Sequence, residues 1–157
     1  MFDFFCEKIE LYSPIIGRTV PLSKVNDPTF SEEMLGKGIA IIPSEGKVFA
    51  PIDGIIGMVF DTKHAISMSS ELGIQILIHV GLETVSLKGA PFKTHVRAGD
   101  RVKKGDLMLE FNIDAIKKAN LDPITPVVIC NSYDYRKVVA YTGKDVSIDD
   151  RVLTLKK

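Results

Sequence analysis

The sequence contains very little cysteine and no tryptophan. Its two cysteines, Cys6 and Cys130, are too few for a disulfide framework and lack the paired spacing of a zinc site. Cys130 ends the apolar run Val127–Ile129, and we expect its thiol to be buried. Disulfides are rare in reducing compartments such as the cytoplasm. The scarcity of cysteine therefore favours a cytoplasmic protein.

Long apolar runs and a targeting segment are also absent from the sequence. No stretch approaches the ~18 apolar residues that suggest a membrane-spanning helix. Residues 1–8 include Phe2, Phe4 and Phe5, but they lack the basic start of a signal peptide. They also lack a cationic face that would hold the phenylalanines against anionic lipid. We therefore expect neither a signal peptide nor a membrane anchor.

The charges of the chain are balanced. Lysine plus arginine and aspartate plus glutamate each number 20, the net charge is zero, and no basic block interrupts the sequence. These features predict that the chain does not bind nucleic acid. Hydrophobic residues make up 45% of the sequence, which is typical of a soluble globular protein. A length of 157 residues suits a single domain spanning residues 1–157.

Short runs of β-branched and aromatic residues, separated by glycine, proline, aspartate and serine, recur along the chain. This pattern predicts an all-β fold, a β-sandwich or barrel, with one or two short helical turns. The helical turns are expected at residues 29–36 and 114–119, which end at Gly36 and before an Asp-Pro turn. Strands are expected at residues 38–42, 47–50, 55–60, 65–69, 74–80, 107–111, 125–130, 138–141 and 152–155.

Two pairs of segments repeat a local pattern. The segment YSPIIG at residues 12–17 returns as FAPIDG at residues 49–54. A Val/Asp/Val pattern is shared by residues 96–106 and 146–152. Repetition of this kind favours a fold that is built from a duplicated β-unit.

Two of the three histidines, His64 and His79, each lie beside a short apolar run. A single histidine there would most often be a core residue, but two in similar contexts favour a functional site. An imidazole titrates near neutral pH and can act as a nucleophile, a proton donor or a metal ligand. Because side chains alternate along a strand, the apolar Ile74, Ile76 and Ile78 must pack on the core, and His79 faces the other side.

The histidines belong to two longer motifs, TKHAI at residues 62–66 and LIHVGLETV at residues 77–85. Over almost its whole length, and with a constant order and spacing of such segments, the chain resembles a known family. That family is the glucose-type enzyme IIA of the bacterial phosphoenolpyruvate-dependent sugar phosphotransferase system, and the resemblance implies a β-sandwich of duplicated hybrid motifs. The other matching segments are residues 12–17, 36–41, 49–54, 87–89, 99–102 and 125–129.

The resemblance implies a phosphocarrier that uses two histidines. His79 would carry the phosphoryl group on Nε2, and no cofactor would be needed beyond that covalent phosphate. His64 would stabilise the phosphoryl group, and Thr62 would orient His64. The Gly81 carbonyl would accept a hydrogen bond from Nδ1 of His79, which leaves the Nε2 lone pair as the nucleophile. Phosphoryl transfer of this kind needs in-line positioning and hydrogen-bond donors.

The same resemblance implies the partners. The small phosphocarrier protein HPr would donate the phosphoryl group, and a cysteine of a sugar-specific IIB domain would accept it during coupled sugar uptake and phosphorylation. Regulatory targets form a further class of partner. An apolar patch with an acidic rim around the histidines would bind these proteins. Its residues are Asp27, Phe30, Leu35, Phe60, Leu77, Glu83 and Val85.

Two other functions fit the same residues less well. A zinc hydrolase of related β architecture needs about three protein ligands, whereas only His64 and His79 are at hand; the two histidines could still share a zinc ion with a partner's carboxylate. A biotinyl or lipoyl carrier is suggested by residues 99–106, but Lys63 lies in Thr-Lys-His and not in the lysine motif of such domains. The third histidine, His95, has no partner motif and is predicted to be an ordinary surface residue.

Overall fold

A computed structural model describes residues 8–157 of the chain. The three phenylalanines near the amino terminus and Cys6 lie outside the described residues. Within residues 8–157, no helix is both long enough and apolar enough to cross a membrane.

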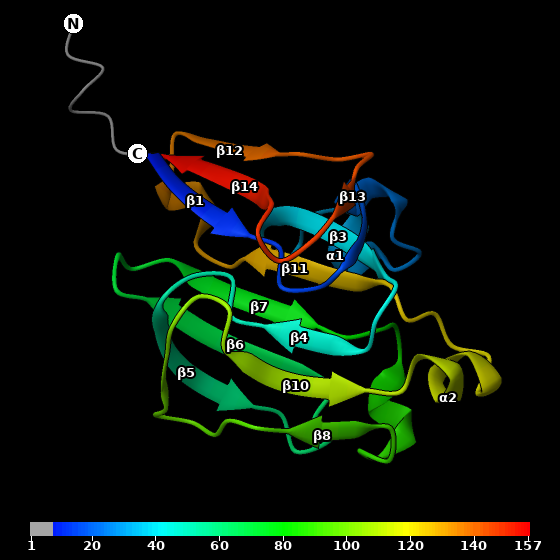
Figure 1. The fold of residues 1–157 in the computed structure, drawn as a ribbon. Helices are drawn as coiled ribbons and strands as arrows, with labels where there is room; N and C mark the ends of the chain where they lie inside the picture. The colour runs from blue at the N-terminus through cyan, green and yellow to red at the C-terminus, as the bar shows by residue number, and fades with distance from the viewer. Residues whose placement is uncertain (1–7) are drawn as a thin grey trace, which may run out of the picture.

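Short antiparallel strands make up much of the described chain, with brief helical turns between them (Figure 1). The strands are β1 (Lys8–Tyr12), β2 (Gly17–Val20), β3 (Lys37–Pro43), β4 (Lys47–Phe49), β5 (Gly54–Val59), β6 (Ala65–Ser70), β7 (Gln75–His79), β8 (Phe92–Thr94), β9 (Arg101–Val102), β10 (Leu107–Phe111), β11 (Thr125–Ile129), β12 (Lys137–Ala140), β13 (Asp145–Val146) and β14 (Arg151–Lys156). The helical segments are η2 (Leu22–Lys24), α1 (Pro28–Ser31), η3 (Thr84–Leu87), α2 (Ile113–Lys118) and η4 (Ser132–Asp134). The prediction of an all-β fold is therefore confirmed.

The strands form three sheets that enclose one main core. An eight-stranded sheet has the order β13-β2-β3-β11-β7-β6-β5-β9, and the two smaller sheets have the orders β1-β14-β12 and β4-β10-β8. All residues of β11 are buried, which suits a strand in the middle of a sheet that is covered on both faces. In the neighbouring β7, buried isoleucines alternate with residues that reach the surface. The core includes Leu11, Ile39, Ile66, Ile76, Met108, Leu109 and Val127.

The repeated segments have equivalent places in the fold. The segments at 12–17 and 49–54 run side by side, because Tyr12 N donates to Pro51 O (3.0 Å) and Phe49 N donates to Pro14 O (2.7 Å). The second pair of segments forms the same turn twice. The Asp100 carboxylate accepts the backbone N–H three residues earlier (2.9 Å), and Asp150 does the same (2.8 Å). The repetition in the sequence thus reflects repetition of local structure.

Three details of the fold differ from the sequence prediction. The strands β1, β2, β8, β9 and β13 were missed; none exceeds five residues, and such short strands depend on distant partners for their hydrogen bonds. The first helical turn was predicted to extend to Gly36 but ends at Ser31, and Glu33 beyond it is left-handed with a φ of 57°. The prediction of a buried Cys130 thiol was wrong, since Cys130 is exposed. Cys130 comes directly after the last residue of β11, in a turn, where the chain has left the part of the sheet that is covered on both faces.

Candidate functional site

His79 is the last residue of β7, a strand that lies between β6 and β11 in the large sheet. Ile76 and Ile78 are buried on one face of β7, whereas His79 is half-buried on the other face, as the alternation predicts. The register places His79 directly opposite Ala65, the first residue of β6. The segment just before β6 contains His64, so the pairing of β6 with β7 brings the two histidines together.

A tight turn after His79 fixes its ring. Gly81 has a φ of 78°, in the left-handed region that favours glycine, and its N–H donates to Ile124 O (3.0 Å). In this conformation the Gly81 carbonyl accepts a hydrogen bond from Nδ1 of His79 at 2.8 Å. The buried Thr84 hydroxyl donates to Val80 O at 2.5 Å and closes the turn from the other side. The orientation of the His79 ring therefore depends on backbone bonds to a segment more than 40 residues away in the chain.

His64 is packed against His79 and is held by its own neighbour. Its ring centroid lies 4.8 Å from that of His79, with the two ring planes at 80°. His64 is only 4% exposed, and its carbonyl accepts the N–H of Val80 at 2.7 Å. The hydroxyl of Thr62 lies 2.6 Å from Nδ1 of His64. When Nδ1 is the acceptor of this hydrogen bond, Nε2 of His64 carries the proton and can act as a donor.

Two phenylalanines flank the histidine pair. The ring centroid of Phe30 lies 5.1 Å from that of His79, and the ring of Phe60 meets His64 edge-on at 5.4 Å. Phe30 is only 4% exposed, so it offers almost no surface to a partner. Its contact with His79 indicates that Phe30 supports the ring from one side, which differs from the docking role expected from the resemblance.

The other residues of the expected docking patch lie on several elements. Leu35 and Val85 are 41% and 52% exposed, and Leu77 is half-buried on the same face of β7 as His79. Glu83 is exposed and immediately precedes η3. Asp27 caps α1 by accepting the N–H of Thr29 at 3.0 Å. Thr84 and Asp122 support the turn after His79 without having been predicted as site residues, and the Asp122 carbonyl accepts the N–H of Leu82 at 2.9 Å. No spacing pattern in the sequence connects Asp122 to the histidines.

The electrostatic surroundings favour neutral imidazoles. Burial and, to a smaller extent, the neighbouring His79 lower the pKa of His64 to about 4. Burial also lowers the pKa of His79, although the hydrogen bond to Gly81 and the charge of Asp27 act in the opposite direction. A neutral imidazole has a free lone pair, so at neutral pH His79 can act as a nucleophile.

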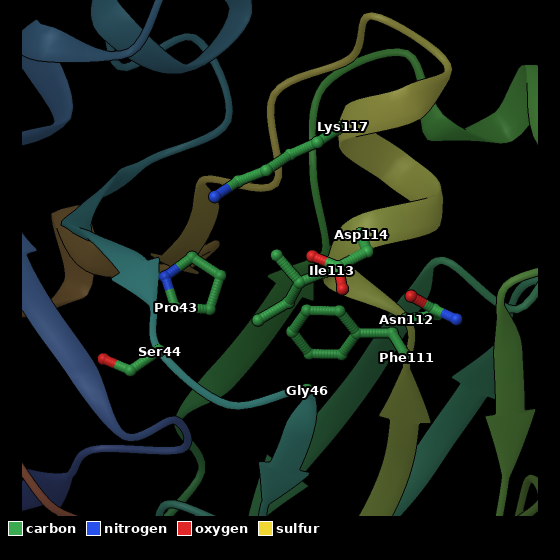
Figure 2. A pocket seen from close by; sticks show the side chains of 8 residues that line it. All are labelled: Pro43, Ser44, Gly46, Phe111, Asn112, Ile113, Asp114 and Lys117. Carbon is green, nitrogen blue, oxygen red and sulfur yellow. The ribbon is translucent and has the colours of Figure 1, made fainter.

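The histidine pair does not belong to a larger cluster of metal-ligand side chains in the described part of the chain. Within residues 8–157 no group of three or more histidine, cysteine, aspartate or glutamate side chains is arranged to hold a metal ion. An open pocket of about 610 Å³ lies elsewhere, between the end of β3 and α2 (Figure 2). Figure 2 shows the extended Lys117 side chain reaching across that pocket from α2. The pocket has no histidine among its lining residues, which are Pro43, Ser44, Gly46, Phe111, Asn112, Ile113, Asp114 and Lys117.

Comparison with known proteins decides the family. The family described as "phosphoenolpyruvate-dependent sugar phosphotransferase system, EIIA 1" matches residues 9–135. This chain belongs to that family. The EIIA 1 match includes both histidine motifs and the Gly81 turn, and it confirms the resemblance found in the sequence.

Three relatives place the chain within the EIIA 1 family. The glucose-specific EIIA component of Oceanobacillus iheyensis is 43% identical over 132 residues, which cover 84% of this chain and 80% of that protein. The β-glucoside-specific EIIBCA component of Dickeya chrysanthemi is 50% identical over 82% of this chain, which spans only 20% of that longer protein. The solved glucose permease IIA from Mycoplasma capricolum matches with a TM-score of 0.88 and 30% identity, covering 96% of this chain and 97% of that one. The chain therefore belongs to the EIIA 1 family, has the fold of the solved glucose permease IIA, and spans about a fifth of the length of the EIIBCA relative.

The lowered pKa values predict how the histidines titrate. We expect the His64 imidazole to take up a proton only as the pH falls to about 4, and His79 to titrate below the ordinary value of 6.5. Asp27→Asn should lower the pKa of His79 further, because it removes a charge that favours the imidazolium form. The measurement is an NMR titration of the imidazole signals. A His64 midpoint near 6.5 would contradict the burial argument.

The Gly81 turn predicts a cost for any side chain at that position. A Cβ on Gly81 would lie 2.5 Å from the methyl carbon of Thr84 and 3.0 Å from the Asp122 carbonyl oxygen. Gly81→Ala should therefore lower the free energy of unfolding by more than Gly99→Ala, because Gly99 also has a positive φ but has open space around it. We expect a difference of about 1–3 kcal/mol between the two variants in urea unfolding. Equal losses would mean that backbone strain alone accounts for the effect.

Proposed function

We propose that the chain is a phosphocarrier which accepts a phosphoryl group from HPr on Nε2 of His79 and passes it to a cysteine of a sugar-specific IIB domain. We also propose that residues 1–157 act as one domain in these transfers. The observation that carries the proposal is the hydrogen bond from Nδ1 of His79 to the Gly81 carbonyl. It leaves Nε2 as the nitrogen with a free lone pair in a ring that burial keeps neutral.

The transfers need only bond exchange at phosphorus. In the first step the Nε2 lone pair of His79 attacks the phosphorus of phosphohistidine on HPr, and the broken N–P bond returns its electron pair to the donor's imidazole. In the second step a cysteine thiolate of the IIB domain attacks the same phosphorus, and Nε2 of His79 leaves with its electron pair. Such reactions depend on in-line positioning and on donors to the phosphoryl oxygens. No cofactor takes part, and the only added group is the covalent phosphate.

His64 is suited to donate to those phosphoryl oxygens. The proposal assigns the Thr62 hydroxyl as the donor to Nδ1 of His64, so that Nε2–H of His64 points toward the phosphoryl group. The perpendicular packing of the two rings supports this arrangement, since one ring presents its edge to the other. A donor fixed before the reaction stabilises the charge that develops on the oxygens without further reorganisation.

The partner surface is proposed around this pair. The exposed Leu35 and Val85, with Phe60 and Leu77, would form its apolar part. Asp27 and Glu83 would form an acidic rim, which suits a basic, transient partner. Phe30 is not assigned to this surface, because it is buried and its ring packs against that of His79. The relative from Dickeya chrysanthemi is named an EIIBCA component, and this supports a IIB domain as the acceptor. The cytoplasm is the compartment that we propose for these transfers.

A zinc-dependent hydrolase is disfavoured as an alternative. Two imidazoles with ring centroids 4.8 Å apart supply at most two of the three protein ligands that a hydrolytic zinc needs. Among the described residues, no third histidine, cysteine or carboxylate completes such a group. A separate prediction concerns the complex with a partner protein, in which His64, His79 and a carboxylate of the partner would together hold a zinc ion.

The first test concerns the site of phosphorylation. Incubation with phosphoenolpyruvate, enzyme I and HPr should add one acid-labile, base-stable phosphate to each chain. His79→Ala should abolish the label because it removes the nucleophile, while His95→Ala should keep it. His95 is the matched control, since it is exposed and bound to Glu110 at 2.6 Å on another sheet. Label on the His79→Ala variant would show that the assignment is wrong.

The second test separates the roles of the two histidines. His64→Gln keeps a side-chain donor but loses the imidazole, and it should still be phosphorylated on His79. Onward transfer to a IIB domain should slow by a factor on the order of 10²–10³, the typical effect of losing one preorganised donor. The measurement is single-turnover labelling followed by a chase with the IIB domain. Transfer at the wild-type rate would remove His64 from the mechanism.

A further inference from the structure

Each of the two histidines has a threonine near it in the sequence. The hydroxyl of Thr62 contacts Nδ1 of His64 directly, at 2.6 Å. The hydroxyl of Thr84 donates instead to the backbone carbonyl of Val80, the residue directly after His79. Contact with a ring explains the first threonine, whereas the second one acts on the backbone and needs a different explanation.

The surroundings of Thr84 are unusual for a polar residue. Thr84 is 0% exposed, although its neighbours Glu83 and Val85 are both exposed. Glu83 has a φ of 58°, in the left-handed region that is unfavourable for a residue with a side chain. The unfavourable conformation therefore lies directly before a buried hydroxyl. Conformations of this kind persist where the surrounding structure imposes them, and they are frequent at functional sites.

The bond from Thr84 to Val80 is not the common bond of a threonine within a helix. In a helix, a threonine hydroxyl binds the carbonyl of a residue one turn earlier in the same helix. Here η3 begins only at Thr84, and Val80 is the first residue after β7. Val80 is 0% exposed, and no backbone N–H of residues 8–157 binds its carbonyl. The buried carbonyl therefore depends on Thr84 for its hydrogen bond.

This hydrogen bond fixes the peptide group between Val80 and Gly81. A peptide group is planar, so its carbonyl and its N–H turn together. The carbonyl is held by Thr84, and the N–H donates to Ile124 O at 3.0 Å. Two bonds on opposite edges oppose rotation of the plane. The next carbonyl along the chain is that of Gly81, which accepts the hydrogen bond from Nδ1 of His79 at 2.8 Å.

We propose that Thr84 is a positioning residue that keeps His79 in the tautomer with its proton on Nδ1. Glycine allows a wide range of φ and ψ, so without the Thr84 bond the Gly81 carbonyl is free to turn away from the ring. Once Nδ1 has no acceptor, the proton can exchange through water to Nε2. The lone pair would then lie on the nitrogen that faces Gly81. The consequence for phosphotransfer rests on the proposed function, whereas the effect on the tautomer does not.

The test is NMR of the imidazole nitrogens of His79, which distinguishes the two neutral tautomers, at a pH well above the pKa of the ring. Thr84→Val replaces the hydroxyl by a methyl group of similar size. We expect it to raise the ratio of the Nε2–H form to the Nδ1–H form about fivefold, the factor that corresponds to one typical hydrogen bond. Thr84→Ala, which adds no methyl group, should give the same shift. Thr84→Ser keeps the hydroxyl and should retain the wild-type ratio.

Thr19→Val is the matched control. Thr19 is also 0% exposed, and its hydroxyl donates to a backbone carbonyl, that of Tyr141, at 2.8 Å. It belongs to β2, which lies two strands away from β7 beyond β3 and β11. The control variant loses the same kind of buried hydrogen bond, so its stability should fall as well. The tautomer of His79 should nevertheless stay as in the wild type.

Phosphorylation by phospho-HPr gives a second readout. Thr84→Val should lower kcat and leave KM almost unchanged, because Thr84 is buried and offers no surface to the partner. Thr84→Ser should recover the rate. A wild-type tautomer ratio in the folded Thr84→Val and Thr84→Ala variants would overturn the proposal, and so would a shifted ratio in Thr84→Ser. If the wild-type chain kept the Nδ1–H form but took up no phosphate on His79, the proposed function would fail while the role of Thr84 in setting the tautomer would stand.

Discussion

The site depends above all on one hydrogen bond, from Nδ1 of His79 to the carbonyl of Gly81. A neutral imidazole has one protonated and one free nitrogen, and this contact selects which nitrogen is free. The carbonyl can point at the ring because Gly81 adopts a φ of 78° and its N–H is bound by Ile124 on the segment before β11. The central strands of the sheet thus set the tautomer of a surface histidine.

The second constraint is the closeness of two rings that would repel each other if both were charged. With centroids 4.8 Å apart and His64 almost fully buried, the pair is stable as two neutral imidazoles. At His79, burial lowers the pKa, and the hydrogen bond to Gly81 and the charge of Asp27 partly offset this effect. The site therefore pairs a buried ring, that of His64, with a half-buried ring, that of His79, although both residues are histidines.

Local patterns in the sequence predicted the elements that depend on residues close together in the chain. The alternation from Ile74 to His79 gave the correct face of β7, and the repeated segments around Pro14 and Pro51 indicated the duplicated structure. Features that depend on tertiary contacts could not be predicted from these local patterns. Short strands such as β13 form only because β2 supplies hydrogen-bonding partners. The support of the Gly81 turn by Asp122, and the burial of Phe30 against His79, likewise follow from packing between segments that are distant in sequence.

The pairing of β1 with β14 places the first and last described strands next to each other, with Lys8 opposite Lys156. A polypeptide that enters this unit can therefore leave it at nearly the same point, on a sheet that holds neither histidine. Such geometry makes the unit modular: connections at either end, or even a covalent closure of the two ends, would leave the strands around His79 undisturbed. The EIIBCA relative from Dickeya chrysanthemi is much longer, and this chain spans only 20% of it. A unit with adjacent ends suits such a longer protein, because connections to other parts do not disturb the histidine site.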